Sequence, residues 1–414
     1  MSGSAAAKEN AATAILSVNS GSSSIKFALY PCTGNRVASA TLTGTVEGLE
    51  PGGTVAICLK HGAEKEALSL SESVPASAGD AFDQALASLR VLIAQRSGNL
   101  QIIAVTHRIV HGGDRYARSM LINDQVMAYL HTLDTLAPLH QPHNLAGVSA
   151  FQIAYPGLPQ IACFDTGFHA DLPELEQVLA IPQALRDAGI RRYGFHGLSY
   201  RYVAARLFEQ TARASQKVVM AHLGNGASLC AMQGGKSQAT TMGFSALDGL
   251  MMGTRSGALD PGVLLHLLRE GWDREKIETT LYKQSGLLGV SGISADMRTL
   301  RASRQPSAVL AINLFTHRLV RECGAMTACL GGIDVLAFTG GIGEHDAALR
   351  LETCNALAYL GLRIDDAANQ TASGDNIMAI HAAGSSVEIW VIPTDEGKVA
   401  AQDAAGLLRL AAID

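Results

Sequence analysis

The chain of 414 residues contains no run of eighteen or more uncharged apolar residues, so no segment is predicted to span a membrane. It also lacks a basic run, and its net charge of −5 argues against nucleic acids and anionic membranes as partners. The seven cysteines lie mostly in apolar segments and show no C-x-x-C spacing. Reduced core thiols are therefore expected, rather than zinc or redox chemistry.

The first fourteen residues, MSGSAAAKENAATA, are small and polar and contain no continuous apolar segment. They are predicted to be a disordered extension rather than a secretion signal, which favours a cytoplasmic protein. The remaining composition, with 48% hydrophobic residues, 17% charged residues and 42 glycines overall, is typical of a compact protein with many tight turns. The length exceeds what one hydrophobic core usually organises, so two domains or more are expected.

Two stretches about half a chain apart share one plan of strand, tight polar turn and strand. Residues 15–30 read ILSV, then NSGSSS, then IKFALY, while residues 218–232 read VVMAHL, then GNG, then ASLCAM. The repetition predicts two similar halves, and a small turn with exposed N–H groups suits polyphosphate binding. These features favour a two-lobed phosphotransfer enzyme.

Two common nucleotide-binding motifs fail in this sequence. GGKS at 234–237 has Cys230 where the Walker phosphate loop requires glycine, and neither G-x-G pair, at 224–226 or 341–343, continues as a dinucleotide fingerprint. Neither a Walker ATPase nor a Rossmann dehydrogenase is supported.

Apolar periodicity and turn residues predict an alternation of helices and strands. Helices are expected near 80–95, 124–136, 144–154, 200–210, 260–269 and 310–330. Buried strands are expected at 102–105, 160–164, 335–339 and 387–392. Residues 286–298 contain too much glycine for regular structure to be predicted, and the helix after Glu396 is expected to pack on the first lobe.

Ionisable residues follow several of the predicted strands, where side chains usually line a cleft. Arg108 lies in a turn after 102–105, and Asp165 follows 160–164. His107 and His111, with His140 and His143 nearby, invite a zinc interpretation. The β-branched pair between the first two histidines and the glycines at 112–113 argue against a helix that carries metal ligands.

Ten motifs, in order, extend over nearly the whole chain after its first fourteen residues. They are VNSGSSSIKFALY (18–30), THRIVHGG (106–113), LAPLH (136–140), FDTGFH (164–169), RYGFHGLSY (192–200), AHLGNGAS (221–228), MGFSALDGLMMGTRSGALDPG (242–262), SGISADMR (291–298), FTGGIGEH (338–345) and IPTDE (392–396). On these residues the chain resembles the acetokinase family.

The resemblance implies an α/β fold of two duplicated lobes with a central nucleotide cleft, similar to the sugar kinase, actin and heat-shock chaperone ATPases. The N-terminal lobe, 15–165 plus 397–414, would hold the acyl and phosphate side, and the C-terminal lobe, 166–396, the nucleotide. The implied reaction is reversible, direct in-line transfer of the γ-phosphoryl group of ATP to acetate, giving acetyl phosphate and ADP. Mg²⁺ would be required, with Mn²⁺ as the alternative, and the enzyme would be a homodimer.

The resemblance also implies roles for residues at matching positions. Asn19 and Glu396 would place the metal, and Lys26 with the first turn would contact phosphate. The catalytic residues would be Arg108, His140, Asp165, His196 and Arg255, of which Arg108 also holds the substrate. The nucleotide would be bound by His222, Leu223, Gly224, Asn225, Gly226, Asp296, Met297, Arg298, Gly341, Ile342, Gly343, Glu344 and His345.

These roles agree with the chemistry of the reaction. Phosphoryl transfer spreads negative charge over the equatorial oxygens, so fixed cations and N–H donors should dominate catalysis. An arginine fork suits a carboxylate, and acetate, with a pKa near 4, is already ionised and needs no general base. Asp165 is therefore expected to orient Arg108 or metal-bound water, and the alternative is that it only caps the turn at Thr166.

The acyl pocket is expected to involve the apolar neighbours Val110, Leu139, Phe195 and Ala246. Many relatives have proline in place of Ala246 and asparagine in place of His345. Because one methylene in a pocket changes discrimination by only about 1 to 3 kcal/mol, propionate should be accepted with acetate preferred. The rivals are a propionate or butyrate kinase and, from another class, a non-catalytic nucleotide switch.

Overall fold

The computed structural model describes residues 12–21, 24–49, 55–61, 64–69, 81–138 and 140–411. Its internal contacts divide the chain into unit 1, Met1–Asp165 with Glu396–Asp414, and unit 2, Thr166–Asp395. The second boundary precedes Glu396, whereas the sequence analysis places it after that residue, because Glu396 begins a helix that packs on unit 1. A disordered extension is expected over residues 1–14. Residues 1–11 lie outside the described part of the chain, whereas Thr13 and Ala14 belong to a strand.

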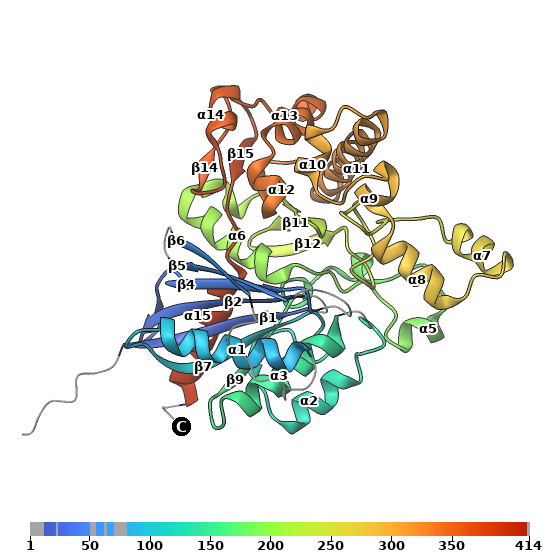
Figure 1. The fold of residues 1–414 in the computed structure, drawn as a ribbon. Coiled ribbons are helices and arrows are strands. Elements are labelled where there is room, and N and C mark those ends of the chain that lie inside the picture. The colour runs from blue at the N-terminus through green and yellow to red at the C-terminus, as the bar shows by residue number, and fades with distance from the viewer. Residues whose placement is uncertain are drawn as a thin grey trace, which may run out of the picture. The chain divides into compact units, whose positions relative to one another are not determined.

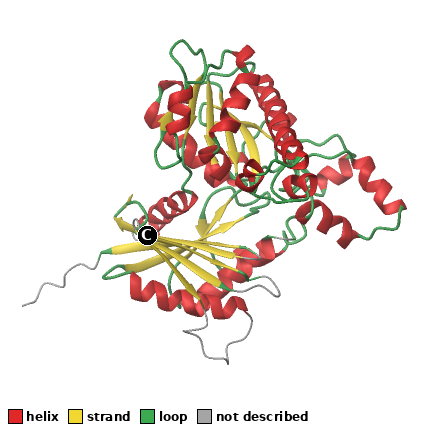
Figure 2. Cartoon of the chain, turned by 45° about the horizontal axis from the view of Figure 1, so that its top comes forward, coloured by secondary structure: helices red, strands yellow, loops and turns green. Residues whose placement is uncertain are grey.

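Unit 1 contains one sheet with helices on both faces (Figures 1 and 2). Its elements are β1 (Thr13–Ser20), β2 (Ser24–Thr33), β3 (Arg36–Val37), β4 (Leu42–Glu47), β5 (Ala56–His61), β6 (Glu64–Ser69), α1 (Ala81–Arg96), β7 (Gln101–Ile109), β8 (Met120–Leu121), α2 (Asp124–His131), α3 (Gln141–Ala154), β9 (Gln160–Phe164) and α15 (Glu396–Ala411).

Unit 2 contains a second sheet. Its elements are η2 (Gly167–His169), α4 (Glu174–Gln177), α5 (Gln183–Asp187), α6 (Gly197–Gln210), η3 (Ala212–Ser215), β10 (Val218–Leu223), β11 (Ala227–Gln233), β12 (Lys236–Thr240), α7 (Pro261–Arg269), α8 (Arg274–Lys283), α9 (Gly286–Ser291), α10 (Met297–Ala302), α11 (Pro306–Leu330), β13 (Val335–Thr339), α12 (Gly340–His345), α13 (Ala347–Ala356), η4 (Ala358–Leu360), α14 (Asp366–Thr371), β14 (Met378–Ala379) and β15 (Glu388–Val391).

The two sheets share one strand order, which establishes the duplication expected from the repeated hairpins. The order β4-β2-β1-β7-β9-β8 in unit 1 corresponds to β12-β11-β10-β13-β15-β14 in unit 2. The directions also agree: both sheets have antiparallel pairs in the hairpin, two parallel pairs after it and an antiparallel edge strand. The fold is therefore α/β and built from two similar halves.

The faces of the unit 1 sheet follow from the alternation of side chains along its strands. Leu16, Val18 and Val105 belong to a core cluster that includes residues of α1 and α3. Helix α15 packs against β1, β2 and β7 and lies on the other face (Figure 1). Residues that alternate with the core cluster, Asn19 and Arg108 among them, therefore point to the face that carries α15.

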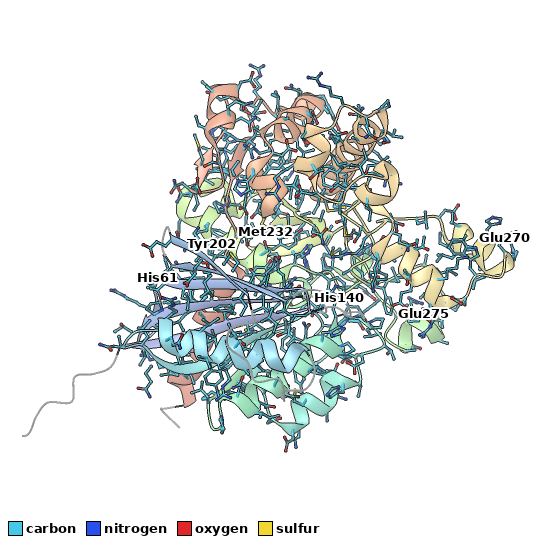
Figure 3. All side chains as sticks on the ribbon, viewed as in Figure 1. His61, His140, Tyr202, Met232, Glu270 and Glu275 are labelled. Atoms are coloured by element: carbon cyan, nitrogen blue, oxygen red, sulfur yellow. The ribbon has the colours of Figure 1, made fainter. Side chains whose placement is uncertain are left out.

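Unit 2 repeats this arrangement with its own helices. Alternate residues of β10, Val218 and Met220, form a core with Tyr200 and Val203 of α6. Helix α11 packs on β10, β11 and β12 and buries Phe315 and Leu319. Helices α7 and α8, marked in Figure 3 by the labels of Glu270 and Glu275, project from this unit and carry no residue assigned to the site.

Local signals explain several element boundaries. Asn123 caps α2 by accepting a hydrogen bond from the Val126 N–H, and proline lies in the first turn of α3, α7 and α11. Gly331, with φ of 64°, ends α11 in the left-handed conformation that glycine tolerates best. None of the helices in the described part of the chain combines the length and apolarity needed to cross a membrane.

The absence of regular structure expected over 286–298 is wrong, because α9 and α10 lie there. The glycines mark helix ends: Gly286, with φ of 64°, begins α9, and Gly292, also with φ of 64°, ends it. Asp296 then caps α10 through the Arg298 N–H.

The strand expected at 102–105 continues to Ile109, because its ladder with β9 extends through Arg108 and Ile109. Helix α2 ends at His131, earlier than expected.

In each unit, the burial of a particular histidine should make stability depend on pH. Burial lowers the pKa of His107 and of His169 from 6.5 to about 4. The unfolded chain therefore binds protons that the folded chain does not, and stability is lost as pH falls from above 6.5 toward 4. At pH 5 each of these two histidines should lower the free energy of unfolding by about 2 kcal/mol relative to pH 8.

We expect the free energy of unfolding by urea to fall between pH 8 and 5, and the fall to shrink in a His107→Gln, His169→Gln double variant. Replacing the exposed His266 by Gln is the control. An unchanged pH dependence in the double variant would contradict the assignment.

Candidate active site

In unit 1 an arginine and two carboxylates meet at the carboxyl ends of neighbouring strands. Arg108 lies near the end of β7, and Asp165 directly follows β9. The Asp165 carboxylate, 1% exposed, accepts two hydrogen bonds from Arg108 Nε, at 2.9 and 3.1 Å, and one from Nη2 at 2.5 Å. Glu396 Oε2, at the start of α15, lies 3.4 Å from Arg108 Nε. This arginine–carboxylate set holds the guanidinium in one orientation.

The same contacts keep Arg108 charged. Burial alone would lower its pKa, but the charges of Asp165 and Glu396 and the hydrogen bond to Asp165 raise the pKa above its ordinary value. The side chain remains 27% exposed. Arg108 is thus a permanent cation with part of its fork open to an anionic ligand.

Asn19 and Lys26 lie beside this set on the α15 face of the sheet. They face each other across the β1–β2 hairpin, and Val18, the residue before Asn19, pairs with His107, the residue before Arg108. Lys26 is exposed and Asn19 is partly buried. Residues 22 and 23 of the expected phosphate turn lie outside the described residues.

Asn144 of α3 joins the ends of β1 and β7 and was missed by the sequence analysis. Its amide nitrogen donates to the Ser20 carbonyl at 2.5 Å, and its side-chain oxygen accepts from the Val110 N–H at 2.9 Å. Because both contacts are buried, Asn144 fixes the two strand ends that carry Asn19 and Arg108.

Asn19 and Glu396 suit a hard divalent cation. Both offer oxygen donors, both lie on the face that carries α15, and Mg²⁺ typically takes only one or two protein ligands beside phosphate and water. No group of three or more His, Cys, Asp or Glu side chains in the described residues is arranged to hold a metal. His107, considered above as a zinc ligand, is instead bound to Gln160 at 2.7 Å and packs edge-on against Phe151.

The remaining residues predicted for unit 1 follow β7 and precede α3. Val110 is 8% exposed and continues directly from β7. His140, labelled in Figure 3, occupies the residue before α3, and its carbonyl accepts from the Asn144 N–H at 3.0 Å. Leu139 lies outside the described residues.

Unit 2 contains a cavity of about 940 Å³ beside the second glycine turn. The lining residues come from that turn, from α10 and the two residues before it, and from the segment between α12 and the first residue of α13: Gly224, Asn225, Ala295, Asp296, Met297, Arg298, Arg301, Gly341, Ile342, His345, Asp346 and Ala347. Eight of them, Gly224, Asn225, Asp296, Met297, Arg298, Gly341, Ile342 and His345, were predicted from sequence to bind a nucleotide.

Two glycines allow the walls of this cavity to approach each other. Gly340 has φ of 76°, and a Cβ there would lie 2.8 Å from the Leu223 carbonyl oxygen. Gly374 has φ of 79°, and a Cβ there would lie 2.6 Å from the ring of His345. A side chain at residue 340 would push α12 away from the Gly224–Gly226 turn, and one at residue 374 would displace the ring of His345.

Asp296 carries out two structural tasks at the cavity. Its carboxylate caps α10 by accepting from the Arg298 N–H at 2.8 Å, and it also pairs with the Arg298 guanidinium at 2.6 Å. The hydrogen bond from Arg298 lowers the pKa of Asp296. The Arg298 side chain is 89% exposed, so its fork is accessible to a ligand.

Five residues predicted to bind the nucleotide do not line the cavity: His222, Leu223, Gly226, Gly343 and Glu344. Glu344 has an internal task, because its Oε1 accepts from the N–H groups of Gly340, at 2.8 Å, and of Thr394, at 3.1 Å. It thus ties α12 to the segment after β15.

The two residues of unit 2 that were predicted to be catalytic, His196 and Arg255, converge on Gly226. A Cβ built on Gly226 would lie 3.0 Å from Arg255 Nη2 and 3.1 Å from His196 Nε2, so these two donors are neighbours at one point of the turn. Arg255 Nη1 donates to the Ala246 carbonyl at 2.6 Å. The ring of His196 stacks on that of His222 with 4.3 Å between centroids.

His196 has an unusual backbone. Its φ of 59° makes it the one non-glycine residue with positive φ among the described residues, and it is followed at once by α6. Such a conformation costs on the order of 1 to 2 kcal/mol and persists only where surrounding contacts hold it. Phe195, predicted for the acyl pocket, is 2% exposed, and its carbonyl lies 2.9 Å from His169 Nε2.

Arg350 is a second residue that sequence reasoning missed. Its side chain is fully buried, and its guanidinium donates to the carbonyls of Gly343, Glu344, Asn369 and Ala372 and to the side-chain oxygen of Asn369. These bonds fix the end of α12, three residues of which line the cavity. No spacing in the sequence signals such a contact, since its partners lie up to 22 residues away.

Comparison with known proteins gives a consistent result. The sequence pattern of the acetokinase family matches residues 14–402. An acetate kinase from Rhodopseudomonas palustris is 47% identical over 386 residues, which cover 92% of this chain and 95% of that protein. An acetate kinase from Methylocella silvestris is 42% identical, covering 95% and 98%.

Solved structures agree in fold over nearly the whole chain. Acetate kinase from Porphyromonas gingivalis superposes with a TM-score of 0.84 at 35% identity, covering 96% of this chain and 100% of that one. A propionate kinase from Francisella tularensis gives the same TM-score at 36% identity, covering 94% and 98%. On its motifs, its duplicated sheets and these matches, the chain belongs to the acetokinase family.

Proposed function

We propose that this protein is an acetate kinase, which reversibly transfers the γ-phosphoryl group of ATP to acetate and yields acetyl phosphate and ADP. The observation that carries the proposal is that Arg255 and His196 both lie next to Gly226, in the glycine turn beside the cavity. The family membership and the oriented guanidinium of Arg108 in unit 1 support the same function. The alternative is a kinase of propionate or another short-chain acid.

The cavity of unit 2 is the proposed nucleotide site. Its volume of about 940 Å³ lies within the range of small-molecule pockets, roughly 300 to 1,000 Å³. Met297 and Ile342 offer apolar surface, whereas the N–H groups near Gly224 and Gly341 suit phosphates. His345, held by its contact with Gly374, would bound the end of the cavity that receives the base.

Arg108 is the proposed anchor of the acyl substrate. Its guanidinium can present parallel N–H donors to a carboxylate, and Asp165 with Glu396 keeps it in one orientation. Acetate binds already ionised, so no proton is removed before attack. Asp165 is therefore proposed as a positioning residue for Arg108, which is one of the two orienting roles expected from the sequence.

His196 and Arg255 are proposed to neutralise the charge that develops on the moving phosphoryl group. Two donors fixed at one point of the turn require no reorganisation during transfer, and each such donor can contribute roughly 3 to 4 kcal/mol. His140 retains its proposed place near the acyl group, with Val110, Leu139, Phe195 and Ala246 as apolar neighbours.

Asn19 and Glu396 are proposed to hold Mg²⁺, with Mn²⁺ as the alternative, and Lys26 to contact phosphate. The ion would supply positive charge that screens the phosphates from the carboxylate acceptor. From the family resemblance we further propose a cytoplasmic homodimer.

The reaction itself is tested with a hydroxylamine trap. Incubation with ATP, Mg²⁺ and acetate should give a hydroxylamine-reactive acyl phosphate that depends on all three. Glycerol in place of acetate, with ADP formation as the readout, is the control for transfer to a hydroxyl group, because a phosphate ester does not react with hydroxylamine. A protein that binds ATP but forms no acyl phosphate would be a nucleotide switch instead.

Replacing Asp165 by Asn tests its role as a positioning residue. The amide would present an N–H group to Arg108, so the fork would lose its orientation. We expect kcat/KM for acetate to fall roughly a hundredfold, with a raised KM for acetate and an unchanged KM for ATP.

Asp134→Asn, which alters another carboxylate of unit 1, is the control and should leave both constants unchanged. Near-normal turnover in a stable Asp165→Asn enzyme would leave Asp165 only the turn-capping role.

Substrate preference is tested by kcat/KM for a series of acids. We expect activity with propionate that is about tenfold lower than with acetate, since one additional methylene must fit beside Ala246. Butyrate should be slower again. Equal or better kcat/KM for propionate would establish the alternative function.

Metal dependence is tested through Glu396. Chelation with EDTA should abolish acyl phosphate formation, and added Mg²⁺ should restore it. In a Glu396→Gln variant we expect the Mg²⁺ concentration for half-maximal rate to rise at least about tenfold, because the remaining amide is a weaker ligand. An unchanged Mg²⁺ requirement would remove Glu396 from the metal site.

A further inference from the structure

The stacked rings of His196 and His222 are each held by a different serine. His196 Nδ1 lies 2.8 Å from Ser228 Oγ, and His222 Nδ1 lies 2.8 Å from Ser199 Oγ. Both serines have no exposed surface. The contacts follow from the fold: His222 and Ser228 are opposite partners on the β10–β11 hairpin, and Ser199 lies in the first turn of α6.

The Nε2 atoms of both rings are directed toward the glycine turn. His196 Nε2 is 3.1 Å from the Cβ position of Gly226, and His222 Nε2 is 3.8 Å from that of Gly224. In a neutral histidine, the direction of the serine hydrogen bond at Nδ1 decides what Nε2 offers to a ligand at this turn. If the serine donates to Nδ1, Nε2 carries the ring proton and is an N–H donor; if the serine accepts from Nδ1, Nε2 offers a lone pair.

Tyr200 decides the direction of the hydrogen bond at His196. The Tyr200 hydroxyl lies 2.5 Å from Ser228 Oγ. Burial raises the pKa of Tyr200 well above its usual value, so the hydroxyl keeps its proton. A buried hydroxyl proton needs an acceptor, and Ser228 Oγ lies within hydrogen-bond distance to accept it. The Ser228 hydroxyl is then free to donate to His196 Nδ1, which leaves the ring proton on Nε2.

Thr394 decides the opposite direction at His222. Ser199 donates its hydroxyl hydrogen to Thr394 Oγ1 at 2.9 Å. Its oxygen must then accept at the other contact, so His222 Nδ1 carries a proton.

We propose that Ser228 and Ser199 are positioning residues that hold the two stacked imidazoles in opposite tautomers, so that His196 presents an Nε2–H donor to the transferring phosphoryl group. The inference rests on the proposed function for its chemical consequence. The His196 donor then points to the same place as Arg255 Nη2 and requires no proton exchange with water during turnover.

The tautomers are measured directly by ¹⁵N NMR of histidine-labelled wild-type protein without substrate. The resonances are assigned by their loss in His196→Gln, His222→Gln and His169→Gln variants. His169 is an internal reference, because it is neutral and its Nε2 must donate to the Phe195 carbonyl. We expect His196 to match the His169 pattern and His222 to show a protonated Nδ1. A protonated Nδ1 on His196, or a bare Nδ1 on His222, would overturn the inference.

Kinetics then test the consequence. In Ser228→Ala we expect kcat to fall roughly tenfold to a hundredfold with little change in KM for ATP, because His196 can adopt either tautomer. Tyr200→Phe should give a smaller loss of kcat, since Ser228 remains but is no longer oriented. Ser199→Ala should instead raise KM for ATP through His222.

Ser237→Ala is the matched control, because Ser237 makes an equally buried hydrogen bond of 2.8 Å to His169 Nδ1. It should lower stability but leave kcat unchanged. Equal losses of kcat in Ser228→Ala and Ser237→Ala would reject the positioning role. If wild-type protein forms no acyl phosphate, the proposed function fails, whereas an active enzyme with the wrong tautomer overturns only this inference.

Discussion

The ends of parallel strands are the constraint on which the proposed chemistry depends. In unit 1, Asn19 and Arg108 are the second-last residues of β1 and β7, and β9 ends just before Asp165. In unit 2, β10 ends before the Gly224–Gly226 turn and β13 ends before Gly340. Strands that run in the same direction bring their carboxyl ends to one edge of a sheet, so residues distant in sequence become neighbours there. The same strand order in both units repeats this edge.

Much of this arrangement was predictable from the sequence. The buried strands 160–164 and 335–339 were located to the residue, because continuous apolar runs bounded by turn residues have few other interpretations. Asp165 and Arg108 were expected at strand ends, and they form an ion pair. Eight of the thirteen residues expected around the nucleotide line one cavity.

What the sequence could not provide depends on tertiary contacts. Asn144 reaches a carbonyl 124 residues away, and Ser199 reaches Thr394 over 195 residues. The glycine content of residues 286–298 led to a wrong prediction of irregular structure, because the sequence alone does not distinguish a glycine at a helix end from one in an irregular loop. The position of Ser228, in contrast, was predictable. A hairpin centred on Asn225 places Ser228 opposite His222, so the register of the two strands brings it next to that histidine.

The charge of the arginine–carboxylate set explains why a divalent ion belongs to the proposed reaction. Arg108 carries +1, and Asp165 and Glu396 each carry −1, so the set has a formal charge of −1, or 0 when the exposed Lys26 is included. Such a set orients a carboxylate ligand but does not attract one strongly, because Coulomb repulsion from Asp165 and Glu396 offsets much of the attraction of Arg108. A divalent cation bound by Glu396 and Asn19 would make the formal charge of the arginine–carboxylate set positive. Orientation and attraction would then be separated: the carboxylates fix the geometry of Arg108, and the proposed ion would supply the charge needed to hold an anion beside a polyphosphate.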